Sequence, residues 1–182
     1  MPGMMDTILN LGLNDEIVES LVKERDERFI YDCYRRFISM YSDVVMGYDK
    51  SKFENIIDDL KKKKKIKYDT EFTTDDIRFL VGEFKKLYVS LAGVAFPSDP
   101  KVQLIEAVKA VFRSWNNDRA KFYRKMNNIP DEWGTAVNIQ EMVYGNLNEN
   151  SGSKCRQFIT EVSAYRYGEW KCNCKRLFRK NW

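Results

Sequence analysis

The first absence in this sequence of 182 residues is histidine, which does not occur at all. Histidine is the commonest general base of enzymes, and it is needed for Cys–His and Ser–His catalysis and for Cys/His zinc fingers. A phosphohistidine intermediate on this chain is excluded for the same reason. Neither glycine signature of phosphate-binding loops, GxxxxGK[ST] or GxGxxG, is present either. We therefore expect no catalytic and no metal-ligating residue in this chain.

Long apolar runs are also missing. The most apolar stretch, about Val89–Phe96, is far shorter than the roughly 20 residues of a membrane span. The first residues lack the basic and apolar regions of a signal peptide. Hydrophobic residues make up 43% and charged residues 32%, which is typical of a globular protein. We expect a cytoplasmic protein without a membrane partner, forming one domain or a piece of a larger one.

Charge and cysteine are unevenly distributed. Residues 153–182 carry eight Lys or Arg and two Glu, whereas residues 1–152 have a net charge of −2. Three of the four cysteines, Cys155, Cys172 and Cys174, lie in the same basic tail. Such asymmetry is typical of a nucleic-acid-binding tail or of a segment with a different origin. The cysteine spacing, without histidine, is a poor zinc pattern.

Apolar residues recur at three-to-four spacing over most of the chain, which predicts helices. Asn14-Asp15, the stretch FTTDDI at 72–77 and Asp99 before Pro100 are placed at helix starts. The helix after Pro100 has an apolar face, whose members are Leu104, Val108, Val111 and Trp115, with Ile105 and Phe112 beside them.

Two further segments are read from their pattern. The lysine run Lys61–Lys65 is either a phosphate patch or the solvated end of a helix, and the helix macrodipole favours the second. The segment GTAVNIQEMVYGN at 134–146 alternates β-branched and polar residues between glycines, which predicts a strand. We therefore expect mostly helix with short strand material at each end.

Four stretches carry a resemblance: MPGMMDTILNLGLND, ERFIYDCYRRFISMYSDVVMG, VKAVFRSWNNDRAKFYRKMNNIPDEWGTAVNIQEMVYGN, and Ser151-Gly152. They resemble the nucleotide-binding region of the pyruvate, phosphate dikinase family, continuously from residue 1 to about residue 152. Phosphoenolpyruvate synthase and the rifampicin phosphotransferases share that domain more distantly. The resemblance implies an α+β, predominantly helical fold, an incomplete ATP-grasp-type nucleotide-binding domain with a helical subdomain inserted at about residues 15–100. It also implies that this chain begins inside the domain.

The resemblance implies a site for ATP with magnesium. In the family the turn containing Gly3 and Thr7 lies against the phosphates, where glycine permits close approach and amide and hydroxyl groups can bind phosphate oxygens. The segment containing Glu141 and Val143 lies beside the adenine, which backbone groups hydrogen-bond. Periodicity alone would instead favour a core role for Val143 and its apolar neighbours. The remaining ATP ligands of the family come from sequence that this chain lacks.

Two functions from different classes stay open. The first is a fragment of pyruvate, phosphate dikinase, whose intact homo-oligomeric form converts ATP, phosphate and pyruvate to AMP, diphosphate and phosphoenolpyruvate through a phosphohistidine. Alone, such a fragment is expected to be inactive. Similarity ends near residue 153, so residues 153–182 are expected to be an out-of-frame or aberrant tail. The alternative is a noncatalytic helical binding module whose basic tail contacts nucleic acid, although we do not expect nucleic acid as a partner.

Overall fold

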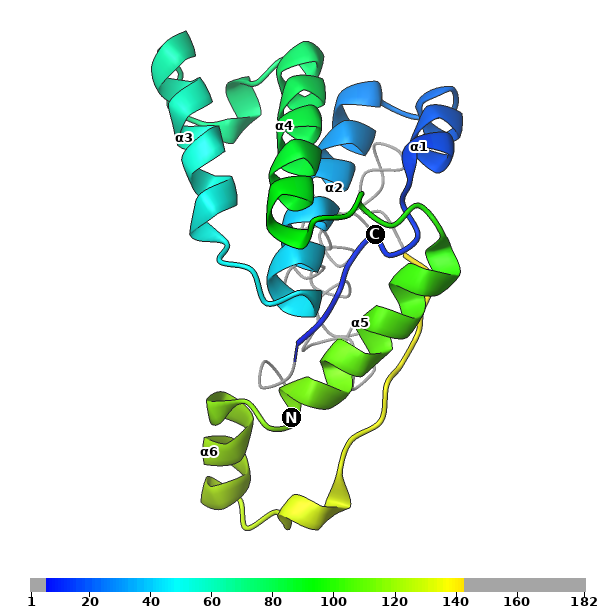
Figure 1. Ribbon diagram of the computed structural model, residues 1–182, viewed down its shortest axis with the longest axis vertical. Coiled ribbons are helices and arrows are strands. Elements are labelled where there is room, and N and C mark those ends of the chain that lie inside the picture. Colours follow the sequence, from blue (N-terminus) through cyan, green and yellow to red (C-terminus); the bar gives the residue numbers. More distant parts are fainter. Residues whose placement is uncertain (1–5, 143–182) are drawn as a thin grey trace, which may run out of the picture. The chain divides into compact units, whose positions relative to one another are not determined.

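The computed structural model describes residues 6–142, which form helices, turns and connecting loops (Figure 1). The described part has six α-helices: α1 (Asp15–Val22), α2 (Glu27–Met40), α3 (Ser51–Lys64), α4 (Thr74–Ala92), α5 (Pro100–Ser114) and α6 (Asp118–Met126). A π-helical turn η1 (Tyr41–Val45) follows α2, and two short 3-10 turns are η2 (Asp69–Glu71) and η3 (Asp131–Trp133). The chain divides into two compact units. One is Ile8–Ala110, and the other contains residues 6–7 and 111–142 of the described part.

Side-chain caps explain where the helices begin. The Asn14 side chain accepts a hydrogen bond from the backbone N–H of Ile17 at 2.8 Å. Thr73 and Asp76 form a reciprocal capping box at the start of α4. The carboxylate of Asp99 accepts from the N–H of Lys101 at 2.8 Å, so the start predicted at Pro100 is confirmed. These bonds satisfy N–H groups that have no partner within the helix.

The core of the unit Ile8–Ala110 lies between α2 and α4, which run side by side, with α1 on α2 and α3 on α4 (Figure 1). Phe53 of α3 meets Phe84 of α4 edge to face, with ring centroids 5.1 Å apart. A second aromatic cluster joins Phe37, Tyr41, Tyr88 and Phe96, all in edge-to-face contacts. Burial raises the pKa of Tyr41 to about 12, with smaller contributions from Tyr88 and Glu106. Aromatic packing therefore holds this unit together.

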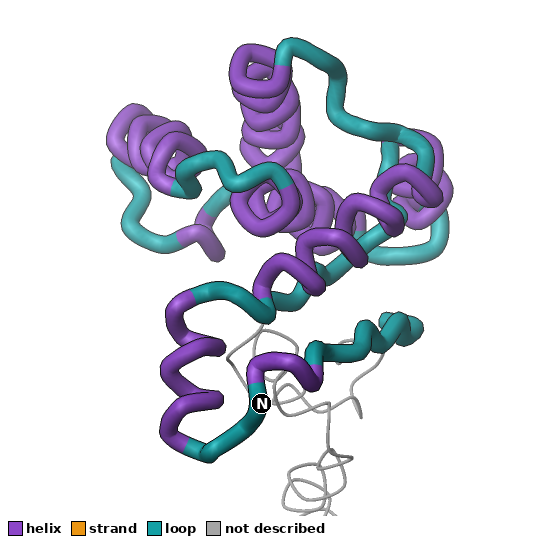
Figure 2. The backbone as a smooth tube through the Cα atoms, turned by 60° about the horizontal axis from the view of Figure 1, so that its bottom comes forward, coloured by secondary structure: helices purple, strands orange, loops and turns teal. Residues whose placement is uncertain are grey.

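The helical part of the expected fold class is confirmed, but its β part is not found among residues 6–142. Figure 2 draws helices and loops there and no strand. Residues 134–142, expected to begin a strand, form no ladder with any described segment. Alternation of apolar and polar residues reports only which face is buried, whereas a strand also needs a neighbouring strand for its hydrogen bonds. Residues 143–146 of the expected strand, and the tail 153–182, lie outside the described residues.

The lysine run closes α3, as the macrodipole argument predicted. The helix ends at Lys64, and Lys65 is the left-handed C-cap residue with φ of 57°. Lys61 forms an ion pair with Asp69 at 2.6 Å, and Lys64 with Asp76 at 2.5 Å. Lys62 also lies 3.5 Å from Asp59, so three of the five lysines are paired with acids of this unit and are not part of a free phosphate patch.

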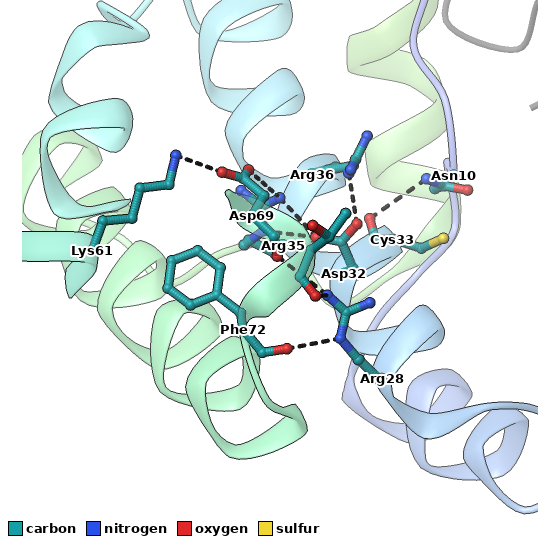
Figure 3. A network of polar contacts seen from close by, with 10 residues as sticks. Asn10, Arg28, Asp32, Cys33, Arg35, Arg36, Lys61, Asp69 and Phe72 are labelled. Carbon is teal, nitrogen blue, oxygen red and sulfur yellow. Dashed lines mark hydrogen bonds and ion pairs between the residues drawn. The ribbon is translucent and has the colours of Figure 1, made fainter. Parts of the chain in front are cut away.

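A network of charges attaches η2 to α2 (Figure 3). Asp32 binds Arg35 at 2.7 Å and Arg36 at 2.8 Å, and Arg35 reaches Asp69 at 3.6 Å. The guanidinium of Arg28 donates to three backbone carbonyl oxygens around η2, those of Phe72, Asp69 and Thr70. Together with the ion pair between Lys61 of α3 and Asp69, these contacts hold η2 against α2 and α3.

This network predicts an acid-sensitive contribution to stability. Burial alone would raise the pKa of Asp69, but the hydrogen bond from Lys61 and the charges of Arg35, Lys61 and Arg36 together lower it. A carboxylate with a lowered pKa stabilises the fold above its ordinary pKa, and this contribution is lost as the pH falls through the folded-state pKa. Asp69→Asn should therefore reduce the free energy of unfolding at pH 7, and this loss should shrink as the pH approaches 2.

Urea unfolding at several pH values measures that difference. Asp59→Asn is a suitable control. The side chain of Asp59 is 70% exposed, and its ion pair with Lys62 is long, at 3.5 Å. Exposed ion pairs contribute little. If Asp69→Asn and Asp59→Asn lowered the free energy of unfolding equally at every pH, the ion pairs of Asp69 would not provide an acid-sensitive contribution to stability.

Candidate functional site

The segment that follows the expected phosphate turn is fixed by backbone and side-chain hydrogen bonds. The backbone N–H of Leu9 donates to the sulfur of Met40 at 3.2 Å, and the side-chain amide of Asn10 donates to the carbonyl of Cys33 at 3.4 Å. The N–H of Gly12 donates to the side-chain oxygen of Gln103 at 2.9 Å. Gly12 has φ of 100°, a backbone conformation that residues other than glycine rarely adopt. The segment is therefore held at three points within the unit Ile8–Ala110.

Gln103 is the hub of this arrangement. Its side chain is fully buried in α5, and its NH₂ group donates to the carbonyls of Leu13 at 3.1 Å and Pro97 at 2.7 Å. Beside it, the Asn14 amide donates to the carbonyl of Ser98 at 2.8 Å. A buried amide is tolerated only when its hydrogen bonds are satisfied, and here both ends are used. One glutamine thus ties two loops to α5.

Residues 6–7 are anchored in the other unit. The N–H of Asp6 donates to the hydroxyl of Ser114 at 3.1 Å, and this hydroxyl donates to the carbonyl of Val111 at 2.7 Å. The Asp6 carboxylate lies 3.8 Å from the guanidinium of Arg119. The backbone immediately before Thr7 is therefore bound to the last turn of α5.

A buried arginine organises the chain between α5 and η3. Arg124 of α6 is 2% exposed, and its guanidinium lies 4.1 Å from the centre of the Trp115 ring. The same guanidinium donates to the carboxylate of Asp131 at 2.5 Å and to the backbone carbonyl of Trp115. The indole N–H of Trp115 donates to the carbonyl of Asp131 at 3.1 Å. These contacts fix η3, from which the chain continues into the expected adenine-side segment.

The structure describes two of the four expected site residues. Thr7 is half-buried and Glu141 is exposed, while Gly3 and Val143 lie outside the described residues. Thr7 and Glu141 are not in a hydrogen bond or ion pair with each other within the described part of the chain. Sequence reasoning did not single out Gln103, Ser114 or Arg124. Both α5 and α6 contain other polar and charged residues, so nothing in the sequence distinguishes these three as buried.

Neither a metal cluster nor a membrane span is found within the described residues. No three side chains of the His, Cys, Asp and Glu types come together between residues 6 and 142 in a way that could hold a metal ion. The helices of this part are too short or too polar to cross a bilayer.

Comparison with known proteins identifies the region. Residues 1–154 match the family described as pyruvate phosphate dikinase, AMP/ATP-binding domain. Pyruvate, phosphate dikinase of Clostridium symbiosum is 59% identical over 155 residues, and the chloroplastic pyruvate, phosphate dikinase 1 of Zea mays is 52% identical over 153. Each alignment covers 84% of this chain but only 18% and 16% of the relative, respectively. The chain thus belongs to the pyruvate phosphate dikinase family, in its AMP/ATP-binding domain.

Proposed function

We propose that this chain forms part of the ATP site of a pyruvate, phosphate dikinase and has no phosphotransferase activity alone. The observation that carries the proposal is the family match over residues 1–154. Since the chain spans less than a fifth of the relatives' length, most of such an enzyme lies outside it. We further propose an ATP-grasp-type, α+β domain in which α1–α4 belong to a helical subdomain at about residues 15–100, with residues 153–182 as a tail of different origin.

In this proposal, Gly3 and Thr7 contact the phosphates of ATP. The support is the anchoring of the adjoining backbone at residue 6 by Ser114, which belongs to the same unit. A phosphate oxygen is bound well by N–H and hydroxyl groups that are already held in place before the ligand arrives.

Backbone groups at Glu141 and Val143 hydrogen-bond the adenine in this proposal. Residues 134–142 lie outside helices, and the described backbone there is not engaged in a sheet ladder. Its N–H and C=O groups are thus not committed to regular secondary structure. Glu141 is exposed, which leaves its backbone accessible to a ligand.

In this proposal magnesium binds together with ATP, because Mg²⁺ is usually held by substrate phosphates with one or two carboxylates. The full reaction, from ATP, phosphate and pyruvate to AMP, diphosphate and phosphoenolpyruvate, needs a histidine that this chain does not contain. The role of this chain is therefore binding. A cytoplasmic location and a homo-oligomeric intact enzyme remain predictions that follow from the sequence and the family.

The experiment that tests the proposal is a titration of the ¹⁵N-labelled chain with Mg-ATP, followed at the amides of Thr7 and Glu141. We expect both signals to shift, with a Kd near 1 mM, or about −4 kcal/mol, because most of the phosphate clamp is missing. Gly3→Val should weaken binding by crowding the phosphate turn. In a coupled assay with pyruvate and phosphate, no phosphoenolpyruvate should form above the control without protein.

Three results would contradict the proposal. Measurable turnover would show that this chain is not merely a binding fragment. A micromolar Kd would show a more complete site than we propose. Shifts with single-stranded RNA at residues 153–182, with none for Mg-ATP, would favour the alternative of a helical module with a nucleic-acid-binding tail.

A further inference from the structure

Ser114 occupies an unusual position in the last turn of α5. Its side chain is buried, with 4% of its surface exposed, and its hydroxyl donates to the carbonyl of Val111 at 2.7 Å. Serines in helices commonly form such bonds to the preceding turn. Unlike an ordinary helical serine, it also accepts a hydrogen bond from the N–H of Asp6, which lies 108 positions earlier in the chain. The hydroxyl therefore links a helix end to a distant loop.

The link acts on the residue directly before Thr7. With its N–H committed to Ser114 at 3.1 Å, Asp6 has a defined peptide plane on its N-terminal side. Only the φ and ψ of Asp6 separate that plane from the amide of Thr7, so fixing it reduces the range of positions that Thr7 can reach. The second contact of Asp6 is the 3.8 Å ion pair with Arg119, whose side chain is 71% exposed. Exposed ion pairs are screened by solvent, so the buried hydroxyl provides most of the constraint.

We propose that Ser114 is a positioning residue for the phosphate-binding turn, holding Asp6 so that Thr7 meets a phosphate oxygen without itself touching the nucleotide. This inference rests on the proposed function, because it takes Thr7 as a phosphate ligand. Binding groups generally need to be held within about 0.5 Å of their productive positions, and a loop residue reaches that precision only with support from a rigid element. α5 is that element here.

The test compares three variants of the full chain. Ser114→Ala removes the acceptor, Ser114→Thr retains a hydroxyl, and Ser42→Ala is the matched control. Ser42 is likewise buried and donates to a helical carbonyl, that of Ile38 at 2.7 Å, but it belongs to the other unit. The measurements are amide hydrogen exchange at Asp6 and the Kd for Mg-ATP.

Ser114→Ala should speed exchange at the Asp6 amide about fivefold and raise the Kd for Mg-ATP about fivefold, the factor that corresponds to a hydrogen bond worth about 1 kcal/mol. Ser114→Thr should stay near the parent chain in both measurements. Ser42→Ala should change neither, although it should lower thermal stability by an amount similar to Ser114→Ala. If Ser114 had a purely structural role, Ser114→Ala and Ser42→Ala would not differ in exchange at Asp6 or in the Kd for Mg-ATP.

Unchanged exchange at Asp6 in Ser114→Ala would overturn the inference, as would an unchanged Kd for Mg-ATP. A Kd raised equally by Ser42→Ala would overturn it as well, because the effect would then be one of general stability. Failure of the proposed function is recognised separately. In that case Mg-ATP would shift no amide of the parent chain, and the assignment of Thr7 to phosphate would be withdrawn together with the positioning role.

Discussion

Replacing Gln103 with leucine is expected to lower the free energy of unfolding by about 3 kcal/mol, since each buried polar group left without a partner costs about 1–3 kcal/mol. The substitution leaves three backbone groups without their present partner: the N–H of Gly12 and the carbonyls of Leu13 and Pro97. Leucine has nearly the same size, so it would recover some apolar burial but none of these bonds. The loss therefore comes from the two loops that Gln103 joins to α5.

Urea unfolding followed by circular dichroism measures this loss. Gln140→Leu is the matched control, because Gln140 is exposed and the same substitution there should change stability by less than about 0.5 kcal/mol. The amide signals of Gly12 and Leu13 should also shift in Gln103→Leu. Equal stabilities of the two variants would show that the Gln103 bonds contribute nothing net.

Phe37→Ala is expected to cost about 4 kcal/mol, within the range for truncating a buried phenylalanine. Phe37 has no exposed surface, and its ring lies 5.7 Å from the rings of both Tyr41 and Phe96. Removing it leaves a cavity between α2 and the loop before α5, and it also removes two edge-to-face contacts. The surrounding helices cannot collapse fully into that space, because α2 is packed on α4 along its length.

The same unfolding experiment tests this prediction, with Phe79→Ala as control. Phe79 lies on α4 but is 52% exposed, so its truncation should cost less than about 1 kcal/mol. Phe37→Leu should be intermediate, because it retains part of the buried volume. A Phe37→Ala variant as stable as Phe79→Ala would mean that the aromatic cluster is loosely packed.

The limits of the helices were predictable because they depend on neighbours in sequence. Asn14 caps α1, Thr73 and Asp76 cap α4, and Asp99 precedes Pro100 at the start of α5. In each case the cap and the N–H that it binds are two or three residues apart. The lysines at the end of α3 follow the same logic, since the macrodipole is a property of the helix itself.

The apolar pattern of α5 does not mark its buried face. Leu104, Val108, Val111 and Trp115 share one face, as the spacing predicted, but they are only half-buried, and Ile105 and Phe112 are exposed. The residues that the structure buries on this helix are small or polar, namely Gln103, Ala107, Ala110 and Ser114. Alanine and serine allow close approach of the backbone, and the glutamine is acceptable inside only because distant loops supply its partners.

Family membership and the candidate site residues follow from the order of residues alone, because long stretches of sequence carry the resemblance. Which residues support that site depends on tertiary structure. Ser114 reaches Asp6 across 108 positions and Gln103 reaches Gly12 across 91. Arg124 is buried because Trp115 and Asp131 surround its guanidinium. Hydrogen bonds between residues so far apart leave no periodic trace in the sequence, since their partners meet only after the helices have packed.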